Sequence, residues 1–128
     1  MTKSFTHTRV LLLAAFASLA SLALSGCALT RVSEKHHAKE AEELHAVGFT
    51  LEQARAAAMQ KGYSCEQQPD RNRSVQKDGV IRKTDILQCN KSSAELICPQ
   101  RRYVVFNLDP ESGKVYAVGQ RITQQSCF

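Results

Sequence analysis

The sequence predicts a small α+β domain in which two helices pack on a three-stranded antiparallel meander held by two disulfides. Two stretches with helical spacing come first, three apolar stretches bounded by turn residues follow, and four cysteines are spread among them. Helices followed by a run of strands are typical of α+β domains. After an export signal at the amino terminus, about 100 residues remain, which is enough for one modest core.

The amino terminus predicts an export signal that ends in a lipidation site. Lys3 and Arg9 precede the uncharged residues 10–24, a run too short to favour a membrane-spanning helix. Leu24-Ser25-Gly26-Cys27 resembles the lipobox of bacterial lipoproteins. The resemblance implies that residues 1–26 are removed, that Cys27 carries lipid, and that residues 27–33 form a tether to a domain at 34–128. An ordinary cleaved signal and an uncleaved anchor are the alternatives.

The charge and the export signal restrict the partners that we expect. Without residues 1–26, 15 Lys and Arg stand against 12 Asp and Glu, scattered along the chain. This mild excess is typical of a solvated surface, and export excludes nucleic acid as a partner. The lipobox implies attachment to a membrane through Cys27. Because Ala28 rather than Asp follows that cysteine, the periplasmic face of the outer membrane is favoured over the inner membrane.

Two helices are expected near the start of the domain. Residues 34–47 predict a first, mostly exposed helix because apolar residues recur there at intervals of three, with Ser33 as its expected cap. The second helix begins at Thr50-Leu51-Glu52-Gln53, which has the Thr-x-x-Gln form of a capping box, and ends at Gly62. Its apolar face is nearly all alanine, so we expect it to lie close to the sheet.

Three strands are expected in the second half of the chain, around residues 84–89, 101–109 and 114–123. Between the last two, Asp109-Pro110-Glu111-Ser112-Gly113-Lys114 predicts a hairpin turn. A loop over residues 110–113 places Leu108 opposite Val115 and Phe106 opposite Ala117. Large residues would then face small ones on the side that receives the helices.

The cysteines that follow Cys27 are even in number, and in an exported chain they predict two disulfides among Cys65, Cys89, Cys98 and Cys127. Four cysteines allow three pairings. In a meander, the end of the first strand, the start of the second and the end of the third lie at one edge of the sheet. We therefore expect Cys98 to pair with Cys127, and Cys65 with Cys89.

Short motifs in this domain resemble a known family. Val47-Gly48-Phe49-Thr50-Leu51-Glu52-Gln53-Ala54, then Phe106-Asn107 at a strand end and Gly113-Lys114-Val115 after a turn, are similar to the SmpA/OmlA-type small outer-membrane lipoproteins. That family includes a subunit of the barrel-assembly machinery. The resemblance spans about residues 33–122 and implies two helices on a three-stranded antiparallel sheet.

The sequence carries no catalytic or metal-binding motif. His36, His37 and His45 lie on the first expected helix without the further ligand that a zinc site needs, and no Cys-x-x-Cys pair occurs. Neither a Gly-x-Ser-x-Gly elbow nor a glycine-rich phosphate loop is present. We expect no catalytic residue, metal or cofactor. The predicted function is a non-enzymatic envelope lipoprotein that binds another protein, and the alternative is a periplasmic inhibitor or accessory of an enzyme.

A binding surface is expected on the second face of the last hairpin. Period-two alternation places five apolar or aromatic residues there, which are Tyr103, Val105, Tyr116, Val118 and Ile122. We hypothesise that Tyr103, Tyr116 and Val118 bind a protein partner, with Arg101, Arg102 and Arg121 at the rim. Residues 64–79 are polar and are expected to form a long loop. The alternative is that this loop covers the face.

Overall fold

The computed structural model describes residues 31–94 and 98–124, and they form one domain that begins at Val32. The described elements are α2 (Glu34–Glu42), α3 (Leu51–Gln60), β1 (Ser64–Cys65), β2 (Asp70–Lys77), β3 (Val80–Ser92), β4 (Gln100–Leu108) and β5 (Val115–Gln124). Neither of these helices is long and apolar enough to span a bilayer. The expected export signal and Cys27 lie outside the described residues.

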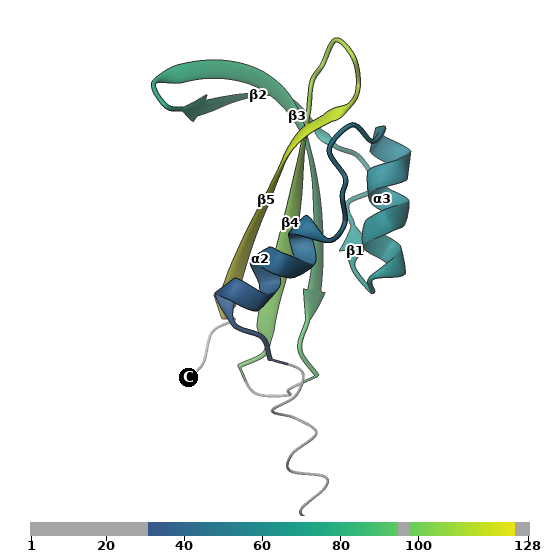
Figure 1. Cartoon of the computed structure of the whole chain (residues 1–128), viewed down its shortest axis with the longest axis vertical. Helices are drawn as coiled ribbons and strands as arrows, with labels where there is room; N and C mark the ends of the chain where they lie inside the picture. The colour runs from purple at the N-terminus through teal and green to yellow at the C-terminus, as the bar shows by residue number, and fades with distance from the viewer. Residues whose placement is uncertain (1–30, 95–97, 125–128) are drawn as a thin grey trace, which may run out of the picture. The chain divides into compact units, whose positions relative to one another are not determined.

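The described strands form one antiparallel five-stranded sheet built around β3 (Figure 1). One side of β3 pairs with β4, and its other side pairs with β1 near one end and with β2 near the other. Strand β5 follows β4 at the far edge. The predicted three-stranded meander is therefore wrong. Residues 64–79, expected to be a loop, instead supply two of the strands.

The physical reason lies in the turn at Asp78 and Gly79. Both residues have positive φ, 52° and 77°, as a tight two-residue hairpin requires. Lys77 and Val80 are paired across this turn, so β2 folds back directly onto β3. An Asp-Gly dipeptide favours such a hairpin, and this signal outweighs the polarity of the residues before it.

The helices begin where the sequence predicts. The hydroxyl of Ser33 accepts the N–H of His36, and Thr50 forms a complete capping box with Gln53. Helix α2 ends at Glu42, earlier than expected. The chain turns at His45, which has a φ of 47°, and the N–H of Gly48 then donates to the carbonyl of Val115 on the sheet.

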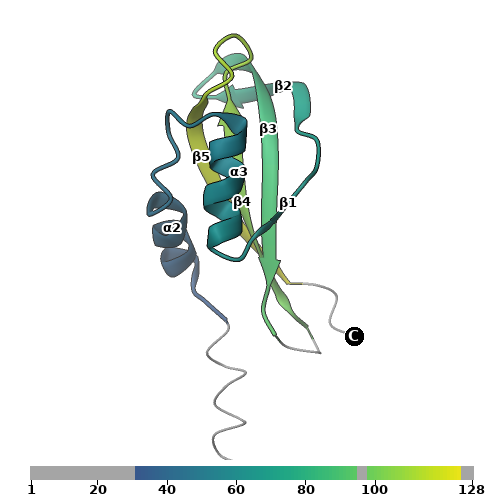
Figure 2. The same ribbon diagram turned by 90° about the vertical axis from the view of Figure 1, so that its right-hand side faces the viewer.

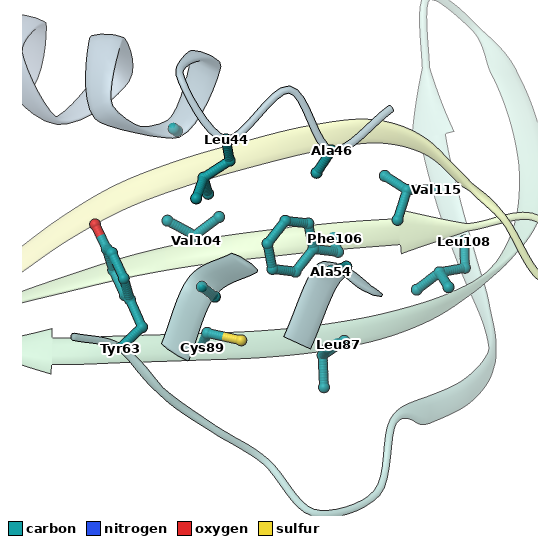
Figure 3. Packing of buried hydrophobic residues seen from close by; sticks show 12 residues of the cluster. Leu44, Ala46, Ala54, Tyr63, Leu87, Cys89, Val104, Phe106, Leu108 and Val115 are labelled. Atoms are coloured by element: carbon teal, nitrogen blue, oxygen red, sulfur yellow. The ribbon is translucent and has the colours of Figure 1, made fainter. Parts of the chain in front are cut away.

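Both helices cover the same face of the sheet, with α2 packed on β5 and α3 on β1, β3 and β4 (Figure 2). The centre of the core is Phe106, which is fully buried among Leu87, Val104 and the alanines of α3 (Figure 3). Ala54 and Ala58 are fully buried. As predicted, their small side chains let α3 lie close to the strands.

One disulfide joins two described residues, Cys65 and Cys89, which are direct cross-strand partners on β1 and β3. This pairing is the predicted one. Cys98 is also disulfide-bonded, but Cys127, its expected partner, lies outside the described residues. The structure therefore supports one of the two predicted pairings, and the fold prediction that included both is corrected to a five-stranded sheet with Cys65–Cys89.

Candidate functional site

The face of the sheet opposite the helices is the candidate site, and we call it the outer face. Its central ladder pairs Tyr103 with Arg121, Val105 with Gly119, and Asn107 with Ala117 across β4 and β5. Most of these side chains are half-buried rather than covered, whereas the alternate residues of β4 are buried under the helices. Among the described residues, no helix lies on the outer face (Figures 1 and 2).

An irregularity in β5 changes the predicted composition of this face. The ladder shifts between Asn107 and Leu108, so two residues of β5, Tyr116 and Ala117, span one step of β4. Beyond this bulge every β5 side chain points to the side opposite the one predicted. Phe106 is paired with Val118 rather than Ala117, and Val118 packs against the core.

Two of the three predicted binding residues therefore share the outer face, and the third does not. Tyr103 and Tyr116 lie there, with Arg121 beside them. Val118 instead faces α2, and the prediction for it is wrong. Arg102 also points to the helix side, where it is buried, so it is not a rim residue.

Each outer-face tyrosine is covered by an arginine. The guanidinium carbon of Arg121 lies 4.3 Å from the ring centre of Tyr103, and that of Arg82 lies 3.6 Å from the ring centre of Tyr116. Arg121 also donates to the side-chain carbonyl of Gln88 on β3, at 2.9 Å. Cation–π stacking and this hydrogen bond hold the guanidinium groups in fixed places on the surface.

The β2–β3 hairpin, residues 73–84, projects past the end of β4, and we call it the arm (Figure 1). Its side chains that share the outer face, including Val75, Val80 and Arg82, line a groove with Tyr116 and Ala117. The groove has a volume of about 560 Å³. Val80 is 66 % exposed, so the groove presents an apolar wall to solvent. The arm overhangs one end of the outer face and leaves the rest open.

On the helix side, a charged cluster joins α2 to the sheet. Glu40 forms ion pairs with two basic residues. Nη1 of Arg102 lies 2.8 Å from Oε2 of Glu40, and Nζ of Lys91 lies 3.7 Å from Oε1. Burial raises the pKa of Glu40, but the positive charges of Lys91 and Arg102 outweigh burial and hold the pKa below 4.5. Burial and repulsion by Arg102 lower the pKa of Lys91.

His37 and Tyr63 complete this cluster. The His37 ring is fully buried, and its Nε2 donates to the backbone carbonyl of Tyr103 at 2.8 Å. The Tyr63 hydroxyl lies 3.4 Å from Nδ1 of His37. Burial and the charge of Glu40 raise the pKa of Tyr63 to about 12, so this hydroxyl stays protonated at physiological pH. Except for the buried Nε of Arg102, which has no hydrogen-bond partner, the polar groups of this cluster bind one another or the backbone, and we interpret the cluster as structural.

The cluster predicts a pH-dependent stability. Because the pKa of Glu40 is lower in the folded protein than its ordinary 4.5, its contribution is present above pH 4.5 and is lost as the pH falls through the folded value. Glu40→Gln should therefore lower the melting temperature at neutral pH, and the difference from the wild type should shrink as the pH falls below 4.5. Thermal unfolding followed by circular dichroism measures this. A difference that is constant with pH would contradict the assignment.

The described residues outside this cluster offer no metal site. In residues 31–94 and 98–124, no group of three or more His, Cys, Asp and Glu side chains could hold a metal ion. His36 in the first turn of α2 and His45 in the turn after α2, both weighed as ligands from the sequence, are exposed.

Comparison with known proteins assigns the chain to no family. It matches no protein-family model, and no curated protein or solved structure is significantly similar to it. The fold is that of an α+β domain with helices on one side of its sheet. The sheet face that the helices leave open is its candidate functional surface.

Sequence reasoning missed Arg82 and the arm. Arg82 lies between the expected loop at residues 64–79 and the expected strand at residues 84–89, so its place over Tyr116 could not be inferred without the hairpin. The signal that could have found them is the Asp78-Gly79 dipeptide, which favours a two-residue hairpin. Ala117 was also assigned to the wrong face, because the bulge at Tyr116 changes the alternation of β5 and pairs Ala117 with Asn107.

Proposed function

We propose that the protein is a non-enzymatic lipoprotein of the cell envelope that binds another envelope protein through the outer face. The observation that carries the proposal is an open sheet face with two arginine-covered tyrosines and an apolar groove at one end. Surfaces enriched in Tyr and Arg are typical of protein-binding sites. Monomeric domains with one covered sheet face normally make the other polar, and this one keeps aromatic and apolar residues.

The proposed lipid anchor and the groove at the arm lie at opposite ends of the sheet. Gln100, at the start of β4, binds both backbone groups of Val32: its Nε2 donates to the carbonyl at 2.8 Å, and its Oε1 accepts the N–H at 3.0 Å. The chain therefore enters the domain at that end of the sheet. Five steps along the chain lead from Cys27 to Val32 and reach at most about 18 Å, whereas the 13 residues of β3 span up to about 40 Å between that end of the sheet and the tip of the arm. A lipid on Cys27 would therefore tether the domain at the end of the sheet opposite the arm.

The anchor is tested by mass spectrometry of the protein extracted from membranes. We expect an amino-terminal peptide that begins at an acylated Cys27, and we expect Cys27→Ser to leave the membrane fraction or to accumulate as precursor. Two or more acyl chains hold a protein stably on a bilayer. An unmodified protein that begins upstream of Cys27 would contradict the anchor.

The binding face is tested with Tyr116→Glu. Because Tyr116 is only partly buried and lies on the outer face, the variant should keep its melting temperature within a few degrees and lose the partner that copurifies from detergent-solubilised membranes. Met59→Glu is the matched control, since Met59 is 58 % exposed on α3 and should keep the partner. A Tyr116→Glu protein that is folded and retains its partner would show that binding occurs elsewhere.

A further inference from the structure

Two guanidinium groups are held against tyrosine rings on the outer face. Arg121 is fixed over Tyr103, and Arg82 is fixed over Tyr116, which lies beside Asn107 at the bulge. Tyr103 and Asn107 are four residues apart on β4, a distance of about 13 Å in a strand. The strand positions that carry the two stacks thus lie at about the spacing of residues i and i+4 of an extended chain.

The acidic groups near these two arginines do not occupy all of their N–H donors. Asp109 approaches Arg82 only at 3.5 Å, and its other carboxylate oxygen accepts the N–H of Ser112 in the β4–β5 turn. Hydrogen bonds from Ser112 lower the pKa of Asp109. Arg121 donates to Gln88, which is neutral. The guanidinium groups therefore keep N–H donors free to receive further carboxylates.

The surface between the two arginines is apolar and shallow. Val105 and Gly119 are paired there, and Ala117 follows on β5. Arg121 crosses β4 to reach Gln88, the strand partner of Val105, whereas Gly119 has no side chain and lines the groove at the arm, so the surface is open at Gly119. A Cβ placed on Gly119 would lie 3.9 Å from the Cβ of Val105, an ordinary contact that fills this opening without displacing backbone.

We infer that the outer face binds an extended segment of a partner protein with the pattern acid-x-apolar-x-acid. Residues i, i+2 and i+4 of an extended chain point to one side with the same repeat as β4. The two acids would reach Arg82 and Arg121, and the apolar residue would lie in the opening at Gly119. This inference rests on the proposed function and specifies the chemistry of the partner at the same surface.

The observations favour a peptide over an anionic membrane surface. Lipid headgroups bind clusters of basic residues without a fixed spacing and do not need an apolar opening between them. Here the two arginines are fixed individually by tyrosine rings and are separated by small apolar residues. A peptide with two acidic residues and an apolar residue between them would contact both arginines and the apolar residues that separate them.

The experiment measures fluorescence anisotropy of a labelled peptide with the full-length protein purified from solubilised membranes. The probe is Gly-Ser-Glu-Thr-Val-Thr-Glu-Ser-Gly, and the control peptide has the same residues with its two glutamates adjacent. We expect saturable binding of the probe that weakens with salt, and at least tenfold weaker binding of the control peptide. Arg82→Gln and Arg121→Gln should each weaken binding about tenfold, whereas Lys39→Gln on α2 should leave it unchanged.

Gly119→Val separates binding from folding. Valine suits a strand, and the position has neither a left-handed φ nor a close neighbour, so the melting temperature should stay the same or rise. The variant should nevertheless lose the probe. Normal binding by Gly119→Val, or equal binding of the two peptides, would overturn the inference.

Phosphatidylglycerol added to the micelles tests the membrane alternative. We expect it to leave binding of the probe intact, and displacement of the probe from the wild type would overturn the peptide assignment in favour of headgroups. This outcome is distinguishable from failure of the proposed function. If the wild type does not bind the peptide but Tyr116→Glu still abolishes copurification of the native partner, the outer face binds a partner of different chemistry.

Discussion

Phe106→Ala is expected to lower the free energy of unfolding by about 3–5 kcal/mol, the usual cost of truncating a fully buried aromatic residue. Phe106 is 0 % exposed at the centre of β4, with Leu87 and Val118 as its cross-strand partners. Its removal leaves a cavity under both helices. For a domain of this size, the loss corresponds to a fall in melting temperature of more than about 12 °C.

The neighbouring residue provides the control for this prediction. Val105 alternates with Phe106 on β4 and lies half-exposed on the outer face, so Val105→Ala should cost about 1 kcal/mol or less. Denaturant unfolding of the two variants measures both values. Similar losses would mean that the helices do not define the single core of the domain.

Removal of the Cys65–Cys89 disulfide is expected to cost about 3–4 kcal/mol on the chain-entropy model, because the bond closes a loop with a sequence separation of 24. Strand β1 has only two residues and is joined to the sheet beside this bond. The double variant Cys65→Ala with Cys89→Ala should therefore unfold at much lower guanidinium concentration. Amide exchange near the end of α3 should also become faster, since β1 follows it directly.

A single substitution serves as the comparison. Cys65→Ala breaks the same bond while it keeps the buried sulfur of Cys89, so it should account for most of the loss in the double variant. Reductant is a poor substitute for these variants, because Cys98 is also disulfide-bonded. A double variant as stable as the wild type would show that the loop is already constrained without the bond.

Local signals in the sequence predicted the local structure well. The capping box at Thr50, the cap at Ser33 and the turn before Lys114 each depend on a few adjacent residues, and all three are present. The predicted partner of Cys65 is also correct. The alanine face of α3 indicated close packing on the sheet, and Ala54 and Ala58 are fully buried there.

The errors arose where the structure depends on a single dihedral choice or on an extra residue. Asp78-Gly79 turns a polar stretch into a hairpin, although that stretch has little apolar alternation of its own. The bulge at Tyr116 moves Val118 from one face to the other, since a shift of one residue exchanges the faces of a strand. Because of the hairpin and the bulge, the observed site contains residues that the predicted site lacked and does not contain Val118. The resemblance to SmpA/OmlA-type lipoproteins stays a prediction.

The most direct test of the outer face as the binding surface is site-specific photo-cross-linking in intact cells. Benzoylphenylalanine at Tyr103 or Tyr116 replaces one partly exposed aromatic residue with another, and the same group at Met59 samples the solvent side of α3. We predict that light produces the same protein adduct from both outer-face positions and none from Met59. An adduct from Met59 alone, or no adduct from the outer face, would contradict the account.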